Sequence, residues 1–296
     1  MNSKVQSLKA FLSTAGRVAL VEVAGTKGST PREKGAFMLV SRAAIFGTIG
    51  GGQLEYMAID KARQMLFSPS RDARIEVDEV CATLDVPLGP EIGQCCGGRV
   101  EVGIRLVDTA LAAELVAVAE TEEAHLPHVY IFGGGHVGQA LASAAALLPV
   151  HAVVIETRAE ALEGMPETVE TRLTPMPEAM VRDAPAGTAF AILTHDHALD
   201  FLIVAEALKR DDTAYVGMIG SKTKKATFKN WFLKSADGSE SEFARLISPI
   251  GGDAVKDKRP PVIAALAAAE IMTALVIHTA ASNAGRQVQY DKAIAG

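Results

Sequence analysis

The chain lacks an excess of positive charge and has few cysteines, and each shortage excludes a class of protein. Its 296 residues hold 29 Lys and Arg against 35 Asp and Glu, a net charge of −6. A general nucleic-acid binder needs a basic face, so this class is excluded and any anionic ligand must be held by local groups. Three cysteines, two of them adjacent, do not make a disulfide framework and fit a reducing compartment.

The N-terminus leads into an amphipathic helix and has no apolar signal core, which predicts cytoplasmic residence. One long apolar run, residues 262–281, reaches the length of a membrane span. It is rich in alanine rather than leucine, and it contains Glu270 and His278. We therefore interpret it as a helix packed on a sheet or on a subunit partner, which favours a homodimer, and we expect no membrane span.

Residues 129–138, with the sequence VYIFGGGHVG, organise the chain. The first four are typical of a buried strand, and a helical pattern follows the glycines. Gly133, Gly135 and Gly138 fit G-x-G-x-x-G between a strand and a helix, where glycines permit a tight turn, close approach of a phosphate and close packing. The N-terminus of such a helix presents unpaired N–H groups to an anion. The alternative is a βα turn that binds nothing.

A second predicted strand, residues 151–155, ends at Glu156. This acid follows Gly138 at nearly the offset expected of a carboxylate that binds a ribose hydroxyl. Strand, turn, helix, second strand and acid occur in order, which favours a nucleotide-like ligand.

Strands and helices alternate through the second half of the chain, with further strands predicted near residues 169–173, 189–193 and 214–220. This pattern predicts a Rossmann-like, doubly wound parallel sheet. The length suggests two domains. We expect an N-terminal α+β domain at residues 1–120, a polar linker at 121–127 and the Rossmann-like domain at 128–296.

Ligands of such sheets bind at the carboxyl ends of the strands. This rule places five side chains around one crevice: His136, Glu156, His195, Asp196 and Ser221. The sequence His195-Asp196-His197 allows a metal site, but histidines two residues apart do not share a helix face. Helix capping by Asp196, or contact with a ligand, is the preferred interpretation.

The N-terminal half contains a polar loop at residues 25–35, where Arg32 and Lys34 offer positive charge or belong to a solvated hairpin. A second glycine-rich turn, Gly50-Gly51-Gly52, precedes a helix predicted at residues 53–66 and could also receive an anion. Residues 73–80 are predicted to form a strand. Residues 81–98 are expected to be irregular, and residues 109–119 to be helical.

Cys95 and Cys96 do not have the spacing of a zinc site, and adjacent cysteines are poor candidates for a simple disulfide. Two interpretations remain open. The thiols are either small buried apolar groups, or they lie near a ligand as soft metal ligands or as sulfur carriers.

Six motifs occur in order: GSTPR (28–32), GTIGGG (47–52), GQCCGG (93–98), FGGGHVG (132–138), THDH (194–197) and GMIGSK (217–222). Together they closely resemble the XdhC/CoxI family of xanthine dehydrogenase accessory proteins, over about residues 8 to 282. One departure is the strongly charged segment at residues 252–261, which suggests a partner contact rather than a binding role.

The resemblance implies a chaperone for the molybdenum cofactor (molybdopterin) without turnover of its own. The family's xanthine dehydrogenase branch holds this cofactor while an oxo ligand is exchanged for sulfur. It then delivers the cofactor to the molybdenum-binding subunit of xanthine dehydrogenase, and a cysteine desulfurase is the expected sulfur donor. Cys95 or Cys96 could contact the molybdenum; no other metal site is expected. The cofactor-binding residues would be Ser29, Thr30, Arg32, Gly51, Gly52, Gln53, Gln94, Cys95, Cys96, Gly133, Gly135, His136, Val137, Gly138, Glu156, Arg158, His195, Asp196 and Ser221.

Two other functions compete with this one. The glycine turn and Glu156 would suit an NAD-dependent oxidoreductase, although the sequence has no convincing proton donor paired with a substrate-binding arginine. A scaffold that only docks a desulfurase to a molybdoenzyme would need no ligand at all.

Overall fold

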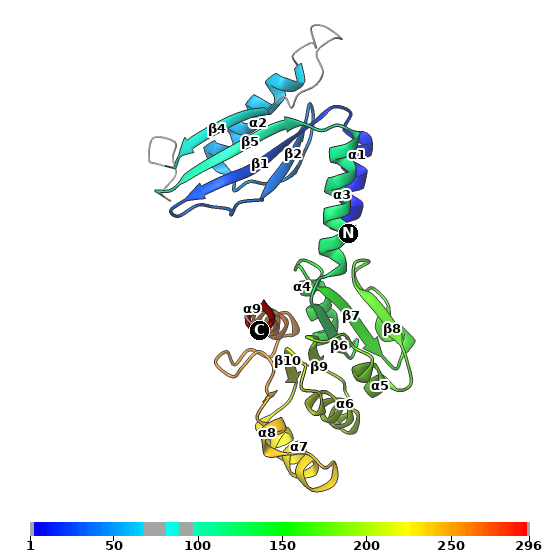
Figure 1. Cartoon of the computed structure of the whole chain (residues 1–296). Helices are drawn as coiled ribbons and strands as arrows, with labels where there is room; N and C mark the ends of the chain where they lie inside the picture. Colours follow the sequence, from blue (N-terminus) through cyan, green and yellow to red (C-terminus); the bar gives the residue numbers. More distant parts are fainter. Residues whose placement is uncertain (1–2, 68–80, 89–96, 295–296) are drawn as a thin grey trace. The chain divides into compact units, whose positions relative to one another are not determined.

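A computed structural model describes residues 3–67, 81–88 and 97–294, with the side chains of Cys81 and residues 283–294 left out. The chain folds as two compact units, and the boundary along the sequence lies between Ala124 and His125. Each unit has its own sheet and its own cores (Figure 1). Gln94, Cys95 and Cys96 lie outside the described residues, as does the strand predicted at 73–80.

The N-terminal unit contains an antiparallel sheet in the order β3-β2-β1-β5-β4. The strands are β1 (Val18–Lys27), β2 (Phe37–Ser41), β3 (Ile45–Gly47), β4 (Cys81–Pro87) and β5 (Arg99–Leu106). Side chains alternate between the two faces, so Val21 and Met38 meet helix α2 (Gly52–Phe67), while Leu20 and Leu39 face α1 (Lys4–Thr14) and α3 (Thr109–Ala124). Helices therefore cover both faces of the sheet.

Three predicted boundaries in this unit are wrong. Residues 81–87 form β4 rather than an irregular segment, because Leu84 and Val86 alternate toward the core and the backbone pairs with β5. Strand β1 runs to Lys27, into the predicted polar loop. Helix α3 extends beyond the predicted residue 119 and into the predicted linker, ending at Ala124, and its Glu122 forms an ion pair with Lys4 of α1.

The C-terminal unit contains a six-stranded parallel sheet in the order β11-β10-β9-β6-β7-β8. The strands are β6 (His128–Phe132), β7 (His151–Glu156), β8 (Glu170–Leu173), β9 (Ala189–Ile192), β10 (Tyr215–Met218) and β11 (Leu246–Ile247). Numbered within the unit, this is the order 3-2-1-4-5-6 of a dinucleotide-binding fold, with its switch point between β6 and β9. The predicted doubly wound sheet is confirmed.

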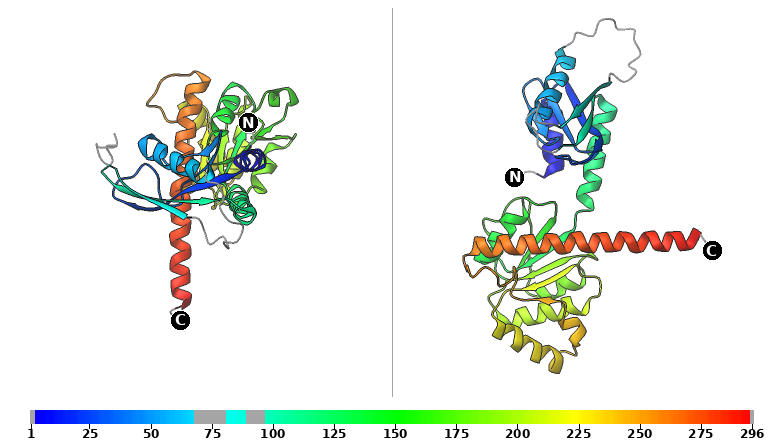
Figure 2. Two further views of the ribbon diagram at one scale, coloured as in Figure 1. Left: turned by 90° about the horizontal axis from the view of Figure 1, so that it is seen from above. Right: turned by 90° about the vertical axis from the view of Figure 1, so that its left-hand side faces the viewer.

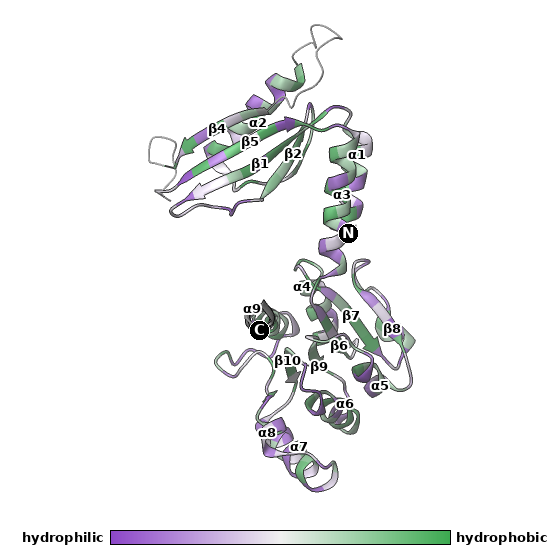
Figure 3. Cartoon of the chain, viewed as in Figure 1, coloured by the Kyte–Doolittle hydropathy of each residue, from purple (hydrophilic) through white to green (hydrophobic). Residues whose placement is uncertain are grey.

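Helices pack on both faces of this sheet. One face is covered by α4 (His136–Ala145) and α9 (Pro260–Ile294), the other by α5 (Pro177–Arg182), α6 (His197–Lys209) and α7 (Lys222–Ser235). A short 3-10 helix, η2 (Ala159–Leu162), follows β7, and α8 (Glu240–Phe243) precedes β11. The parallel strands are mostly green in the hydropathy colouring of Figure 3, as expected for a sheet buried on both faces.

Helix α9 includes the long apolar run. By length and composition, residues 260–282 could cross a membrane. However, Ala264, Ala267 and Ile271 belong to the core of the sheet. Glu270 is held there because it accepts hydrogen bonds from Tyr215 Oη and from the Gly251 backbone N–H, both at 2.7 Å. The first part of α9 is therefore a core helix.

Candidate functional site

The glycine turn lies between β6 and α4, at the carboxyl edge of the sheet. Gly133 has a φ of +107°, and a Cβ there would lie 2.8 Å from the Leu193 carbonyl oxygen. A Cβ on Gly134 would lie 2.3 Å from the carbonyl oxygen of Ala161, and one on Gly138 would lie 1.9 Å from that of Gly133. These three glycines are required by the fold itself.

Gly135 differs from its neighbours. It is exposed, its φ is −70°, and a Cβ there would meet no atom within 4 Å in the part of the chain that the structure describes. It is the N-cap residue of α4, so no side chain caps this helix. The fold does not require glycine at this position, whereas close approach of a ligand phosphate would. His136 is exposed beside it and Val137 is half-buried.

Glu156 lies at the end of β7 with its side chain 4% exposed. Its Oε2 accepts hydrogen bonds from the Gly134 N–H at 2.8 Å and from Arg158 Nη2 at 3.2 Å. Its Oε1 accepts from the Thr157 N–H at 2.8 Å, the Thr157 hydroxyl at 3.1 Å, the Arg158 N–H at 3.2 Å and Arg158 Nε at 3.4 Å. Burial raises the pKa of this carboxyl, but the hydrogen bonds from Arg158, Gly134 and Thr157 outweigh it and lower the pKa to about 2.

The Glu156 carboxylate thus accepts hydrogen bonds from the glycine turn and from the two residues that follow it at the end of β7. Six donors share two oxygens, so a ribose hydroxyl would have to displace one of them. The Arg158 side chain is 42% exposed, and it is the charged group of this pair that solvent reaches. The spacing predicted the location of Glu156 correctly, but not the direction of its hydrogen bonds.

The neighbouring strand ends carry His195, Asp196 and Ser221. Asp196 caps α6 by accepting from the Ala198 and Leu199 N–H groups, and Ser221 caps α7 by accepting from the Lys224 N–H. His195 is exposed. The capping interpretation of Asp196 is confirmed, and no cluster of three metal-ligating side chains occurs within the described ranges.

A buried ion pair connects these two strand ends, and the sequence did not reveal it. Asp200, in the first turn of α6, receives hydrogen bonds from Lys224 Nζ, the Thr194 N–H and the Thr194 hydroxyl. Lys224 also donates to the Ile219 carbonyl oxygen at 3.0 Å. The Asp200 and Lys224 side chains are 0% and 7% exposed. The pair fixes the THDH and GMIGSK motifs against each other.

In the N-terminal unit, the turn Gly50-Gly51-Gly52 has φ angles of 125°, 77° and 67°. Its donors hold the protein's own Glu55 carboxylate, which accepts from the Thr48 hydroxyl at 2.5 Å, the Ile49 N–H at 3.1 Å and the Gly51 N–H at 3.0 Å. The anion that this turn binds is therefore the carboxylate of Glu55, a residue of the same chain. Gly52 and Gln53 are exposed at the start of α2.

The three motifs of the N-terminal unit meet at one place. Ser29 forms a parallel bridge with Gly97. A Cβ on Gly98 would lie 2.1 Å from the Ser29 carbonyl oxygen, and a Cβ on Gly50 would lie 2.7 Å from Pro31 and 3.3 Å from Arg32. Ser29 and Arg32 are exposed and Thr30 is half-buried. The sequence treated these motifs as separate, and no local pattern indicates that they touch.

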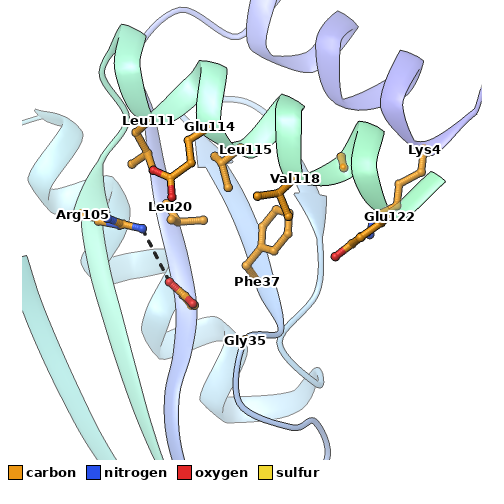
Figure 4. Close-up of a pocket in the computed structure, with 12 residues that line it drawn as sticks. Lys4, Leu20, Gly35, Phe37, Arg105, Leu111, Glu114, Leu115, Val118 and Glu122 are labelled. Carbon is orange, nitrogen blue, oxygen red and sulfur yellow. Dashed lines mark hydrogen bonds and ion pairs between the residues drawn. The ribbon is translucent and has the colours of Figure 1, made fainter. Parts of the chain in front are cut away.

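A cavity of about 180 Å³ lies elsewhere in the same unit, between α3 and the sheet (Figure 4). Its apolar lining includes Leu20 and Phe37 from the sheet and Leu115 from α3. Two ion pairs lie on its rim, since Arg105 lies 3.9 Å from Glu22 and Lys4 lies 2.9 Å from Glu122, and Glu114 lines the cavity as well. None of the predicted site residues lines this cavity.

Comparison with known proteins is consistent with the two-unit architecture. Residues 129–271 match the model of the XdhC Rossmann domain, and residues 12–76 match that of the XdhC and CoxI family. The uncharacterized protein YqeB of Escherichia coli K12 is 27% identical over 270 residues, covering 86% of this chain and 43% of that protein. The chain therefore spans less than half the length of that relative.

A crystal structure from Bacillus halodurans, described as a xanthine dehydrogenase, has a TM-score of 0.74 to this chain. The match covers 93% of this chain and 96% of that one at 18% sequence identity. At this identity the likeness shows a shared fold.

Proposed function

Because the chain belongs to the XdhC and CoxI family, we propose that it holds the molybdenum cofactor during sulfuration and delivers it to a xanthine dehydrogenase-type enzyme. Membership of this family of accessory proteins supports a role in xanthine dehydrogenase maturation. The cofactor, the desulfurase and the receiving molybdoenzyme subunit are the finer parts of the proposal.

The observation that carries the proposal is the meeting of three motifs in the N-terminal unit. Ser29 and Gly97 pair through their backbones, and Gly98 is packed so tightly on Ser29 that no side chain would fit. Gly97 and Gly98 directly follow Cys95 and Cys96 in the chain. Polar groups and the Arg32 guanidinium thus belong to the same loop cluster as the residues that flank the thiols. A soft thiolate suits molybdenum or a transferred sulfur.

In the C-terminal unit, the open turn at Gly135 fits a terminal phosphate. Here α4 begins without a side-chain cap, and no atom of the described residues fills the space that a Cβ of Gly135 would take. The backbone N–H groups and the positive end of the helix dipole suit an anion. Arg158 adds a fixed positive charge at the neighbouring strand end.

The bound cofactor would supply a metal whose oxo ligand can be exchanged for sulfur. The protein's part would be to bind and orient it. Within the N-terminal unit, Arg32 and the polar side chains of Ser29 and Thr30 would contact its polar atoms. Within the C-terminal unit, taken by itself, the turn at Gly135 is suited to a phosphate.

Co-expression with the cofactor's biosynthetic enzymes tests the proposal. We expect molybdopterin to copurify at close to one equivalent, detected by fluorescence after oxidation to its stable pterin derivative. The variant Cys95→Ser/Cys96→Ser should lose cofactor or fail to restore xanthine dehydrogenase activity. Cys81→Ser, which changes the third cysteine of the chain, is the matched control and should behave as wild type.

Two results would contradict the proposal at different levels. Wild-type cofactor content and full restoration of activity by the double variant would refute the thiol role alone. Absence of any pterin from the wild-type protein, under conditions where xanthine dehydrogenase itself becomes loaded, would refute the chaperone function.

An NAD-dependent oxidoreductase is the second candidate, favoured by the strand order 3-2-1-4-5-6 and the turn at Gly135. The hydrogen bonds of Glu156 oppose it, because the carboxylate that would bind a ribose is already engaged. Titration with NADH, followed by its fluorescence, distinguishes the two functions. Tight binding with turnover of a carbonyl compound would favour the oxidoreductase.

A further inference from the structure

The cavity between α3 and the N-terminal sheet is formed within one unit, and its apolar lining suits a ligand. Helices α1 and α3 lie side by side on this face of the sheet, as Figure 2 shows with both helices seen nearly end-on. Side chains of native proteins normally fill the space between a helix and a sheet, yet here about 180 Å³ stays open beside Leu20, Phe37 and Leu115. Val118 also lines the cavity and is 50% exposed, so an apolar ligand would remove its side chain from water.

Five charged side chains line the same cavity, and their charges do not balance. Lys4 and Glu122 form an ion pair of 2.9 Å. Arg105 lies 3.9 Å from Glu22, which is long for an ion pair. Glu114 is exposed and makes no hydrogen bond or ion pair with any residue that the structure describes. Two cations therefore face three carboxylates, and the lining has an excess of one negative charge.

The excess charge belongs to one end of the cavity. Figure 4 shows Arg105 and Glu114 at one end and Lys4 and Glu122 at the other, with apolar side chains between them. At the first end a single guanidinium lies near two carboxylates, those of Glu22 and Glu114. Whichever carboxylate it approaches, the other still lacks a cation, and the apolar lining begins directly beside it.

The sheet is also left open next to this end. Gly103 lies two residues before Arg105 on β5, so both face the same side of the sheet, and its register partner on β1 is Glu22. A Cβ on Gly103 would meet no atom of the described residues within 4 Å, and its φ is not positive. The fold thus does not require this glycine. A glycine inside a strand weakens the strand, and it often marks a place where a ligand comes close to the backbone.

We infer that the cavity binds a small aliphatic primary amine, with its ammonium group on Glu114 and its alkyl body between α3 and the sheet. The ammonium supplies the positive charge that the lining lacks, and a hydrogen bond between two charged groups is stronger than one between neutral groups. The volume is that of about six water molecules, so the ligand has about six heavy atoms. The inference does not rest on the proposed cofactor function, because none of the residues assigned to the cofactor lines this cavity among the described residues.

Three probes with one branched alkyl body test the assignment: isopentylamine, isopentanol and isovalerate. The full chain, isotope-labelled at the methyl groups of leucine and valine, is titrated with each probe and followed by NMR at low ionic strength. The amine should shift the methyl signals of Leu20, Leu115 and Val118 and should saturate. Its dissociation constant should be lower than that of the alcohol by about fivefold or more, and isovalerate should bind weakest. High salt should reduce the preference for the amine, because it screens an exposed carboxylate.

Two matched variants make the result specific. Glu114→Gln should bind the amine within about twofold of the alcohol and should leave the affinity for the alcohol unchanged. Its melting temperature should equal that of the wild type, since Glu114 is exposed and makes no printed contact that the fold would lose. Asp60→Asn removes the same charge from an exposed position on α2, on the opposite face of the sheet, and should keep the full preference for the amine.

Each of three results would overturn the inference: equal affinity of wild type for amine and alcohol at low ionic strength, a preference for the amine that survives Glu114→Gln, and shifts confined to methyl groups away from the cavity. Tightest binding of isovalerate would overturn it as well and would assign the cavity to an anion held by Arg105. A wild type that carries no pterin would refute the proposed function and leave these titrations unchanged, so the two proposals fail separately.

Discussion

Replacing Glu156 by glutamine gives a sharp test of the glycine turn, because this carboxylate connects the turn to β7. The variant keeps the size of the side chain and one carbonyl oxygen, but removes the charge that Arg158 and three backbone N–H groups share. The pKa of Glu156 is lowered from 4.5 to about 2. At neutral pH this difference corresponds to about 3 kcal/mol of stability that depends on the ionised carboxylate.

Glu156→Gln should therefore lower the free energy of unfolding of the C-terminal unit by about 3 kcal/mol at pH 7. For a unit of this size, about 3 kcal/mol corresponds to a melting temperature lower by roughly 6–12 °C. Trp231 is the single tryptophan of the chain and lies in α7, so its fluorescence follows this unit alone. Glu163→Gln, at an exposed site in the same region, is the control and should melt as wild type.

The pH dependence has a definite sign. A carboxyl whose pKa is lower in the folded state stabilises the fold above its unfolded pKa and loses this effect as the pH falls through its folded pKa. The gap in unfolding free energy between wild type and Glu156→Gln should be full above about pH 5 and should narrow progressively from pH 4.5 toward pH 2. A variant that melts within 1 °C of wild type at pH 7, or a gap that stays constant down to pH 3, would refute the reasoning.

Two further predictions concern the carboxyl edge of the sheet. Gly135→Val should fold with near-wild-type stability, since no described residue has an atom within 4 Å of the added Cβ, but it should lose phosphate-dependent cofactor binding. Gly138→Ala should instead unfold the unit, because its Cβ would lie 1.9 Å from a carbonyl oxygen. Full restoration of xanthine dehydrogenase by Gly135→Val would favour the scaffold function. Asp200→Asn should cost about 3–5 kcal/mol in urea unfolding because Lys224 stays charged in a buried site, and adding Lys224→Met should recover part of this loss. Additive losses in that cycle would show that the two side chains are not coupled.

The fold of the C-terminal unit could be predicted from the sequence because its signals are local. Each parallel strand is a short apolar run, and each is followed by a glycine or a capping residue before the next helix, as at Gly133, Asp196 and Ser221. Since the carboxyl ends of parallel strands lie at one edge, the positions of the candidate residues followed from the fold class. The strand β4 was less accessible, because its pairing with β5 determines it.

Contacts between distant segments could not be predicted. Nothing in the segment around Ser29 indicates that it pairs with Gly97, and the acid–base pair of Asp200 and Lys224 has no spacing rule. The spacing of Glu156 from the glycines was correct for a ribose ligand, yet its oxygens turn toward the protein. A spacing rule predicts where a side chain lies in the fold. Its hydrogen-bond partners depend on which backbone and side-chain donors around it still need an acceptor, and only the complete fold determines these.

In both glycine turns a backbone N–H group donates to a carboxylate of the protein itself, and this limits where a ligand phosphate can bind. The Gly51 N–H donates to Glu55, and the Gly134 N–H donates to Glu156. In each turn the protein's own carboxylate takes the donors that a ligand anion was expected to use. Buried donors without acceptors are costly, so a turn that stays folded without ligand needs such an internal acceptor. A ligand phosphate at α4 would then be received one step further along the chain, from Gly135 onward, where the helix has no side-chain cap.

Glu156→Gln and Gly135→Val consequently act on different properties. Glu156→Gln should change the stability of the unit with little direct effect on ligand binding. Gly135→Val should change ligand binding with little effect on stability. Loss of both properties in either variant would show that the internal and the ligand-directed donors are not separate.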